Sequence, residues 1–442
     1  MDDQTAQARM LMPFLTDIDS RAAIRGSRDP LGAQAIWTLL GRHVVGGLTT
    51  NTTSVRDFVV LLLGHWFIEK LDEAGSREEA LPVFIRWEQL ASYARFQAGD
   101  TGFRGTTRTR RFLEDGPKVT ISAQPAYQIL ANQKIYGLWG LYTQAARSSG
   151  LLDEKEPRLT PAARDLAEKV YRDLLGRETV GQIVELLGKR SATIRPSNGD
   201  EKLIGAIAYA LGFKRKRAQL EMTVFRETLA WGGPGDTKRT NGLQKQLAHL
   251  LVAKGGDLRV SLDADDVRAL AKEAGRKRHA ALGTRLEQIL SAESVIAPAT
   301  AAYQYVLSRD GADLATVVGE IRDQWGPALK KRADAAGFGA LKDDVLRAVR
   351  DPKTADLWLE AGRRMGAGDF GGLVETLVEL NRDVMWKRDK ASPWVQVTNG
   401  KLDVHFADER GRLPSAEQLA SYWVSPYFLG ALRAIALELG EE

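Results

Sequence analysis

The segment Ile135–Tyr171, IYGLWGLYTQAARSSGLLDEKEPRLTPAARDLAEKVY, has the pattern of the second half of a winged helix-turn-helix. Its first part repeats apolar residues at three- and four-residue spacing, which predicts a helix with one buried face. Gly150 ends this helix, and two short apolar runs around the charged turn Asp153–Pro157 predict a small hairpin, the wing. Thr160 and Pro161 suit the N-cap and first position of a closing helix. The segment therefore predicts a helix that can lie on DNA, followed by a wing.

An arginine-rich stretch, RGTTRTRR at Arg104–Arg111, precedes this segment and is expected to form a loop with a short helical turn. Arginine side chains and threonine hydroxyls donate hydrogen bonds to phosphates, and Gly102 and Gly105 permit close approach of the backbone. The alternative is a solvated loop or an arginine network that ties domains together. The position before the winged helix favours contact with the DNA backbone. The residues expected to contact nucleic acid are Arg104, Arg108, Arg110 and Arg111 in the stretch, and Gln144 and Arg147 on the following helix.

Net charge alone does not identify a partner. The chain has 62 Lys and Arg residues and 57 Asp and Glu residues, so its formal net charge is only +5. Two further basic clusters are KRKR at Lys214–Arg217 and RKRH at Arg276–His279. Both are predicted to lie in helices, where consecutive residues fan around the axis. They are interpreted as solvated surface rather than as nucleic-acid sites.

The chain contains no cysteine, which excludes disulfides, thiolate metal sites and a cysteine nucleophile. The reducing cytoplasm is the simplest location. The apolar run Phe58–Phe67 is too short to span a bilayer, so no membrane association is expected. The N-terminus has no charged-then-apolar leader, so secretion is not expected either.

No catalytic residue, cofactor or metal ligand is expected from the sequence. The five histidines are dispersed without a paired ligand spacing, and His65 on an apolar helix is interpreted as a core residue. The chain lacks the Walker pattern, so a partner helicase would have to supply any ATP-driven motor. A carboxylate-only magnesium site stays open, because spacing alone cannot select its ligands.

The predicted fold is mainly α, a helical multi-domain protein with an embedded winged helix-turn-helix and a small C-terminal β-hairpin. At 442 residues the chain exceeds what a single core usually serves. The strands Trp394–Val397 and Leu402–Phe406 flank Asn399-Gly400, the dipeptide best suited to a tight hairpin. The expected regions are an N-terminal helical region (1–80), a winged-helix-like domain (81–176), a helical domain (177–380) and the hairpin with a final helix (381–442).

Three motifs together resemble uncharacterised proteins of bacterial antiphage defence islands, which are encoded beside helicases and nucleases. They are D-I-D-x-R with G-S-R-D-P-L-G in Asp17–Gly32, L-T-T-N-T-T-S at Leu48–Ser54, and the P-W-V to Y-F-L pattern of Pro393–Leu429. The charged loop Asp17–Pro30 can hold a phosphate or a metal, and a surface ion-pair loop is the preferred alternative.

The resemblance carries no catalytic motif and implies a context rather than a reaction. The expected function is a non-catalytic DNA-binding or adaptor subunit of an antiphage defence complex, with DNA and a helicase or nuclease as partners. The alternatives are a protein-interaction scaffold without DNA binding and a divergent metal-dependent nuclease whose carboxylates assemble only in three dimensions.

Overall fold

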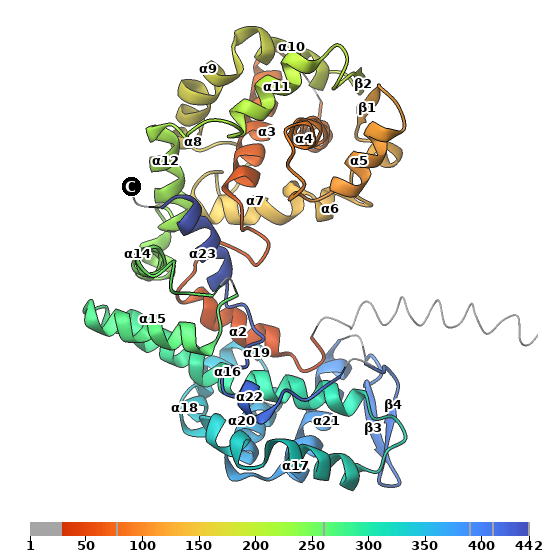
Figure 1. Cartoon of the computed structure of the whole chain (residues 1–442), viewed down its shortest axis with the longest axis vertical. Helices are drawn as coiled ribbons and strands as arrows, with labels where there is room; N and C mark the ends of the chain where they lie inside the picture. Colours follow the sequence, from red (N-terminus) through yellow and green to blue (C-terminus); the bar gives the residue numbers. More distant parts are fainter. Residues whose placement is uncertain (1–28, 77, 260, 389, 409–410, 441–442) are drawn as a thin grey trace, which may run out of the picture. The chain divides into compact units, whose positions relative to one another are not determined.

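A computed structural model describes residues 29–76, 78–259, 261–388, 390–408 and 411–440 (Figure 1). Contacts between its elements divide the chain into two compact units, and both are discontinuous in sequence. Unit 1 contains the described residues up to 41 together with those of 259–427, and unit 2 contains 42–258 and the described residues from 428. This division differs from the four consecutive domains that the sequence suggested, because the last helix packs with elements near residue 250.

Unit 2 is built around the helix α4 (Ala80–Gln97). Every residue from Val83 to Arg95 is buried, which requires neighbours on all sides of the helix. Figure 1 looks nearly along α4 and shows α3 (Val55–Glu73), α5 (Thr106–Glu114) and α11 (Glu201–Ala210) arranged around it. The α3 helix, which contains the apolar run Phe58–Phe67, is buried over most of its length.

The remaining elements of unit 2 are short. They are β1 (Val119–Ser122), η1 (Pro125–Tyr127), α6 (Gln133–Tyr136), α7 (Leu138–Ser149), α8 (Pro161–Leu166), η2 (Ala167–Tyr171), α9 (Arg172–Leu175), α10 (Arg177–Leu187), β2 (Ser191–Ile194), α12 (Gln219–Phe225), η3 (Arg226–Ala230), α13 (Asp236–Arg239), α14 (Leu243–Ala253) and α23 (Leu429–Glu438). Some of them, such as β1, α6, α7, η2 and α10, pack on α3 or α4, whereas η3, α14 and α23 pack with one another.

The segment that predicted a winged helix forms its elements in the expected order. The helix α7 ends at Gly150, whose φ of 81° is left-handed. Leu152 and Leu159 then form one antiparallel bridge, and the Thr160 side chain caps α8. However, β1 pairs with β2 in antiparallel register, not with the residues of the wing. The small sheet that normally supports a wing is therefore not formed from β1.

Unit 1 is built around the long helix α16 (Ala280–Leu307). Its apolar middle is buried by packing with α15, α17, α18, α20 and α21. The bounds of the other elements are α2 (Ala33–Arg42), α15 (Ala264–Arg276), α17 (Leu314–Arg332), α18 (Ala335–Gly339), α19 (Lys342–Val349), α20 (Pro352–Ala367), α21 (Phe370–Lys387), β3 (Val395–Thr398), β4 (Lys401–Val404) and α22 (Ala416–Leu419).

The predicted C-terminal hairpin is confirmed as β3 and β4, which pair in antiparallel register. Its turn residues Asn399 and Gly400 have φ values of 53° and 78°, the left-handed pair that a type I′ turn requires. The chain is mainly helical, as predicted, and the strands of the described residues form two two-stranded sheets. None of the helices in the described ranges combines the length and apolarity needed to cross a bilayer.

Two basic clusters differ from their predicted helical setting. Lys214–Arg217 lies in the irregular segment between α11 and α12, and Arg276–His279 spans the break between α15 and α16. In the first cluster Arg215 and Arg217 turn inward and pair with the fully buried Glu221. Half of this cluster is therefore an internal charge network, and only the other half is solvated surface.

Candidate nucleic-acid interface

The predicted loop Arg104–Arg111 is mostly helical, because α5 begins at Thr106 and runs for nine residues. Gly105 precedes it with a φ of 91°, and a Cβ placed there would lie 3.0 Å from the Ile129 carbonyl oxygen. Glycine at this position therefore allows α5 to begin directly against the segment that follows β1. The helix displays its side chains at fixed spacing, which a loop would not do.

The four predicted arginines lie together on α5 or immediately before it. Arg104, Arg110 and Arg111 are exposed, whereas Arg108 is half-buried. The Arg104 guanidinium donates to the Asn51 side-chain oxygen at 2.6 Å. The guanidinium groups of Arg110 and Arg111 lie 5.9 and 5.5 Å from the ring centroids of Phe96 and Phe112, respectively.

Arg108 anchors the cluster, because its Nη1 donates to the Gln128 carbonyl at 3.2 Å. The partners of the four arginines are thus neutral groups, and within the described part of the chain no carboxylate forms an ion pair with any of them. Guanidinium groups without a carboxylate partner can still pair with phosphate. Arg110 and Arg111 have the most donors available, because Arg104 and Arg108 each use one within the protein.

Of the threonines in the cluster, Thr107 is exposed, whereas the other two serve the fold. The Thr106 hydroxyl donates to the Phe103 carbonyl at 2.6 Å, and Thr109 is buried. The exposed face of α5 consists of Thr107, Arg110, Arg111 and Glu114. Two of the hydroxyls expected to reach phosphates are therefore not available.

The sequence around this helix has an excess of positive charge. Residues 101–152 contain seven Lys and Arg residues and two Asp and Glu residues, a balance equal to the +5 of the whole chain. The other 390 residues therefore sum to zero. No acidic residue occurs from 116 to 152. A stretch of this kind attracts polyanions even though the whole chain is nearly balanced.

Exposed aromatic and apolar side chains lie beside the arginines, in the 127–136 segment. Tyr127, Ile135 and Tyr136 are 38%, 52% and 47% exposed, respectively. The segment is tied to α5 through the Arg108–Gln128 hydrogen bond, so the basic and aromatic groups belong to one region. Sequence reasoning missed these three residues, although the absence of acidic residues around them was a usable signal.

The buried Gln133 holds the 127–136 segment onto the core. Its Nε2 donates to Glu88 at 2.7 Å and to the Ile85 carbonyl at 3.1 Å. Its Oε1 accepts from the backbone N–H of Ile129. The exposed Tyr127, Ile135 and Tyr136 therefore stand on a rigid base.

Gln144 and Arg147 on α7 are placed less favourably than predicted. Gln144 is exposed, but Arg147 is half-buried, and its Nε is buried without a hydrogen-bond partner among the described residues. The end of α7 is covered, because the Arg239 guanidinium donates to the Ser148 carbonyl and Gly233 packs against Ser149. A recognition helix contacts base edges through exposed side chains, and on α7 only Gly140 and Gln144 are exposed.

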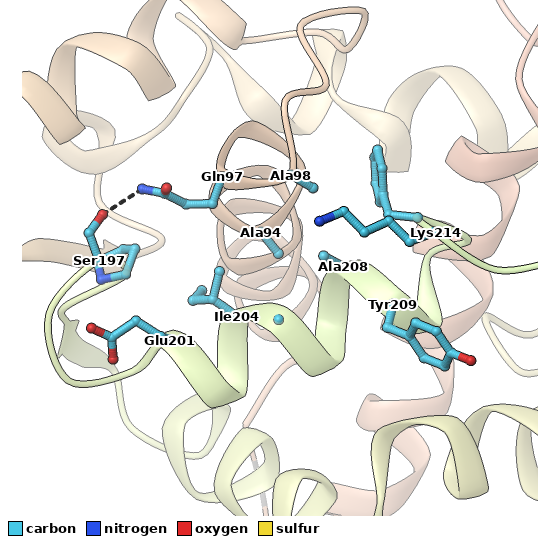
Figure 2. A pocket seen from close by; sticks show the side chains of 12 residues that line it. Ala94, Gln97, Ala98, Ser197, Glu201, Ile204, Ala208, Tyr209 and Lys214 are labelled. Carbon is cyan, nitrogen blue, oxygen red and sulfur yellow. Dashed lines mark hydrogen bonds between the residues drawn. The ribbon is translucent and has the colours of Figure 1, made fainter.

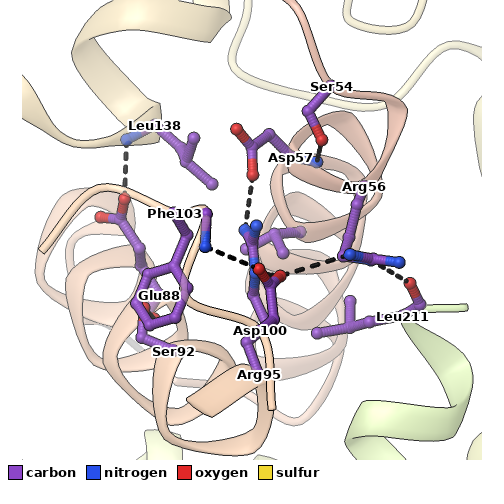
Figure 3. Close-up of polar contacts among 12 residues, drawn as sticks. Ser54, Arg56, Asp57, Glu88, Ser92, Arg95, Asp100, Phe103, Leu138 and Leu211 are labelled. Carbon is purple, nitrogen blue, oxygen red and sulfur yellow. Dashed lines mark hydrogen bonds and ion pairs between the residues drawn. The ribbon is translucent and has the colours of Figure 1, made fainter. Parts of the chain in front are cut away.

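A network of buried charges links α3, α4 and α7 with the loop that leads to α5 (Figure 3). Asp57 accepts from Arg95 at 2.5 Å and from the Tyr142 hydroxyl at 2.8 Å. Arg95 also pairs with Asp100 at 2.9 Å, and Arg56 approaches the same carboxylate at 3.3 Å. These contacts fix the start of the loop that carries the arginine cluster.

Asp100 keeps its charge in this network. Burial raises the pKa of Asp100, but the paired Arg95 and the N–H of Gly102, which donates at 2.8 Å, outweigh it and hold the pKa below the ordinary value. Arg95 also lies 4.8 Å from the ring centroid of Phe103. The network is a structural support, since each of its charges has a partner.

Glu88 is a fully buried carboxyl group of unit 2 with a strongly raised pKa. Its oxygens accept from the Leu138 N–H and from Gln133 Nε2, each at 2.7 Å, so it caps the first turn of α7. Burial raises the pKa of Glu88 to about 7. With both oxygens occupied by structural donors, Glu88 is a cap rather than a general base.

The predicted core role of His65 agrees with its surroundings. The ring is fully buried, its Nδ1 lies 3.0 Å from the Pro157 carbonyl, and it stacks on Trp139. Burial lowers the pKa of His65 to about 4. Within the described residues, no group of three His, Asp or Glu side chains is arranged to hold a metal ion.

A groove of about 480 Å³ lies between α4 and α11, and none of the four arginines lines it (Figure 2). Its walls include the small residues Ala94, Ala98, Gly205 and Ala208. Lys214 extends across it toward Ala98, and at the other end Gln97 donates to the Ser197 hydroxyl at 2.7 Å.

The loop Asp17–Pro30 falls almost entirely outside the described residues. Asp29 belongs to the described part, where it accepts from the Gln34 N–H at 3.0 Å and lies 3.4 Å from Arg388. These contacts fit the ion-pair interpretation for that residue. Comparisons of the chain with protein-family models, curated proteins and solved structures find no match.

Proposed function

We propose that unit 2 binds the phosphate backbone of nucleic acid through α5 and the adjoining 127–136 segment. On this proposal the chain is a non-catalytic DNA-binding or adaptor subunit of an antiphage defence complex, the context that its sequence motifs imply. The observation that carries the proposal is the gathering of four arginines without carboxylate partners, in a stretch, residues 101–152, with seven basic and two acidic residues.

Contact with the backbone is favoured over reading of bases. The order of helix, wing and closing helix is that of a winged helix, yet α7 is largely covered and the turn of the wing carries Asp153, Glu154 and Glu156. Acidic side chains at a wing oppose contact with phosphates. The α5 helix is therefore assigned the principal role, and α7 a supporting one.

A fluorescence-anisotropy titration with a labelled 20-base-pair duplex tests the proposal. Arg110 and Arg111 are exposed, so their replacement by alanine leaves the core intact. The double variant R110A/R111A is expected to lose affinity by at least about tenfold at low salt, because two charge-assisted contacts disappear. The matched control K169A/R172A removes two exposed charges that are already paired with Asp165 and Glu168.

The control variant distinguishes binding at a defined site from attraction by the total charge of the protein. Both variants lower the net charge by two, so equal losses would show that only total charge matters and would contradict the proposed site. A wild-type protein that fails to bind the duplex at low salt would also refute the proposal.

A docking role for proteins is the second candidate, and one exposed side chain favours it. Trp386, near the end of α21 in unit 1, is 62% exposed. Exposed tryptophans often form the centre of a protein interface. Co-purification with the products of adjacent genes after nuclease treatment, compared between wild type and W386S, tests this role; retention of the partners by W386S would argue against it.

A further inference from the structure

The groove between α4 and α11 has room for a flat ring. Its small lining residues leave room where longer side chains would fill it, and a Cβ added at Gly205 would meet no atom within 4 Å. A volume of about 480 Å³ lies within the usual range for small-ligand sites. The groove therefore has the volume to take an aromatic ring system.

One wall of the groove is an aromatic ring held from behind. The guanidinium of Arg56 lies 4.0 Å from the centroid of the Phe213 ring. Arg56 is itself fixed, because its Nε donates to the Leu211 carbonyl at 3.1 Å and its Nη1 lies 3.3 Å from Asp100. The Phe213 ring is thus positioned in advance, which lowers the entropic cost of stacking a ligand on it.

The two ends of the groove carry different polar groups. Lys214 has a φ of 57°, and its side chain extends across the groove toward Ala98 (Figure 2). No carboxylate in the described ranges forms an ion pair with it. At the opposite end, Gln97 and Ser197 supply a carboxamide and a hydroxyl, which can hydrogen-bond the edge of a heterocycle.

We propose that this groove binds a nucleotide, with the base lying on the small residues against Phe213 and the phosphate paired with Lys214. The open groove and the pre-positioned Phe213 ring suit the base of a nucleotide, and the Lys214 ammonium suits its phosphate. The nucleotide can be a free monophosphate or one unit of a single strand. If the ligand is one unit of a single strand, the inference rests on the proposed nucleic-acid binding. If it is a free monophosphate, the inference is independent of that proposal.

Isothermal titration of the full chain with each of the four deoxynucleoside 5′-monophosphates tests the site. The variant G205L adds a side chain to the groove at a position where the added Cβ meets no other atom within 4 Å. The variant K214M removes the cation and keeps the side chain at nearly the same length. Each is expected to weaken binding by about tenfold or more. K216M is the matched control, because Lys216 is an exposed neighbour that does not line the groove.

Three further binding measurements show which part of the ligand is recognised and where it comes from. Inorganic phosphate alone is expected to bind much more weakly than a nucleotide, and equal binding would overturn recognition of the base. A labelled single-stranded tetranucleotide that binds more tightly than the monophosphates, and loses this affinity in G205L, identifies a strand as the source. R110A/R111A is expected to leave monophosphate binding unchanged, which separates this site from the α5 site.

Two results would refute the proposal. One is the absence of saturable binding of all four monophosphates at millimolar concentration. The other is binding that is unchanged in both G205L and K214M, provided that thermal unfolding shows both variants to be folded.

Discussion

Gly105 shows how one residue positions the arginine cluster. Its left-handed φ of 91° and the nearby Ile129 carbonyl leave no room for a side chain. We expect G105A to lower the free energy of unfolding by about 1–3 kcal/mol, through backbone strain and steric overlap. Chemical denaturation measures this change. G116A is the control, since a Cβ there meets no atom within 4 Å, and an equal loss in both variants would contradict the account.

Two buried titratable residues of unit 2 affect stability in opposite directions. The pKa of Glu88 is raised from 4.5 to about 7, so its contribution is full below pH 4.5 and is lost as the pH rises toward 7. The pKa of His65 is lowered from 6.5 to about 4, so its contribution is full above pH 6.5 and is lost as the pH falls toward 4. Each effect is on the order of 3 kcal/mol.

In the wild type these two effects on the free energy of unfolding offset each other. In the variant E88Q, which lacks the carboxyl group, the pH dependence caused by His65 is expected to appear alone. The free energy of unfolding of E88Q should fall more steeply than that of the wild type between pH 6.5 and 4.5, because only the destabilisation by His65 protonation remains. Urea unfolding followed at half-unit pH intervals measures the slopes. Parallel wild-type and E88Q curves would contradict the assigned role of Glu88.

At the scale of elements, local signals predicted the structure well. Thr160 caps α8, as the sequence indicated, because a cap depends on only a few neighbouring residues, and Ser54 caps α3 in the same way. The hairpin at Asn399-Gly400 follows from turn geometry in the same way. The pairing of β1 with β2 was not predictable, since Val119 and Ile194 are far apart in sequence and both strands have four residues.

The part of the candidate site that depends on local sequence was predicted, and the part that depends on distant contacts was not. The four arginines are recognisable as a cluster in the sequence, and α5 keeps them together. The covering of α7 by the segment around Gly233 and Arg239 depends on contacts more than 80 residues away in sequence, so the accessibility of Arg147 could not be inferred.

The covering of α7 leads to a prediction at the scale of this element. Replacing the exposed Gln144 by alanine is expected to change duplex affinity by less than about twofold, because α7 presents too little surface to enter a groove. Anisotropy titrations with two duplexes of unrelated sequence measure the effect. A large loss that differs between the two sequences would show that α7 reads bases.

At the scale of the whole molecule, the distribution of charge matters more than its sum. A chain with a net charge of only +5 would attract nucleic acid weakly if its basic residues were spread evenly. Instead, basic residues gather in stretches of unit 2 such as residues 101–152, where seven Lys and Arg residues occur with two Asp and Glu residues. The two units can therefore differ in role, with unit 2 facing the polyanion and unit 1 free to contact proteins.

The salt dependence of duplex binding tests the central claim most directly. The logarithm of the association constant should fall linearly with the logarithm of salt concentration, with a slope of about −0.9 for each phosphate neutralised. For R110A/R111A we predict a slope that is smaller in magnitude by about 1.8, whereas K169A/R172A should keep the wild-type slope. Identical slopes for the wild type and R110A/R111A would contradict the assignment of α5 as the phosphate-binding element.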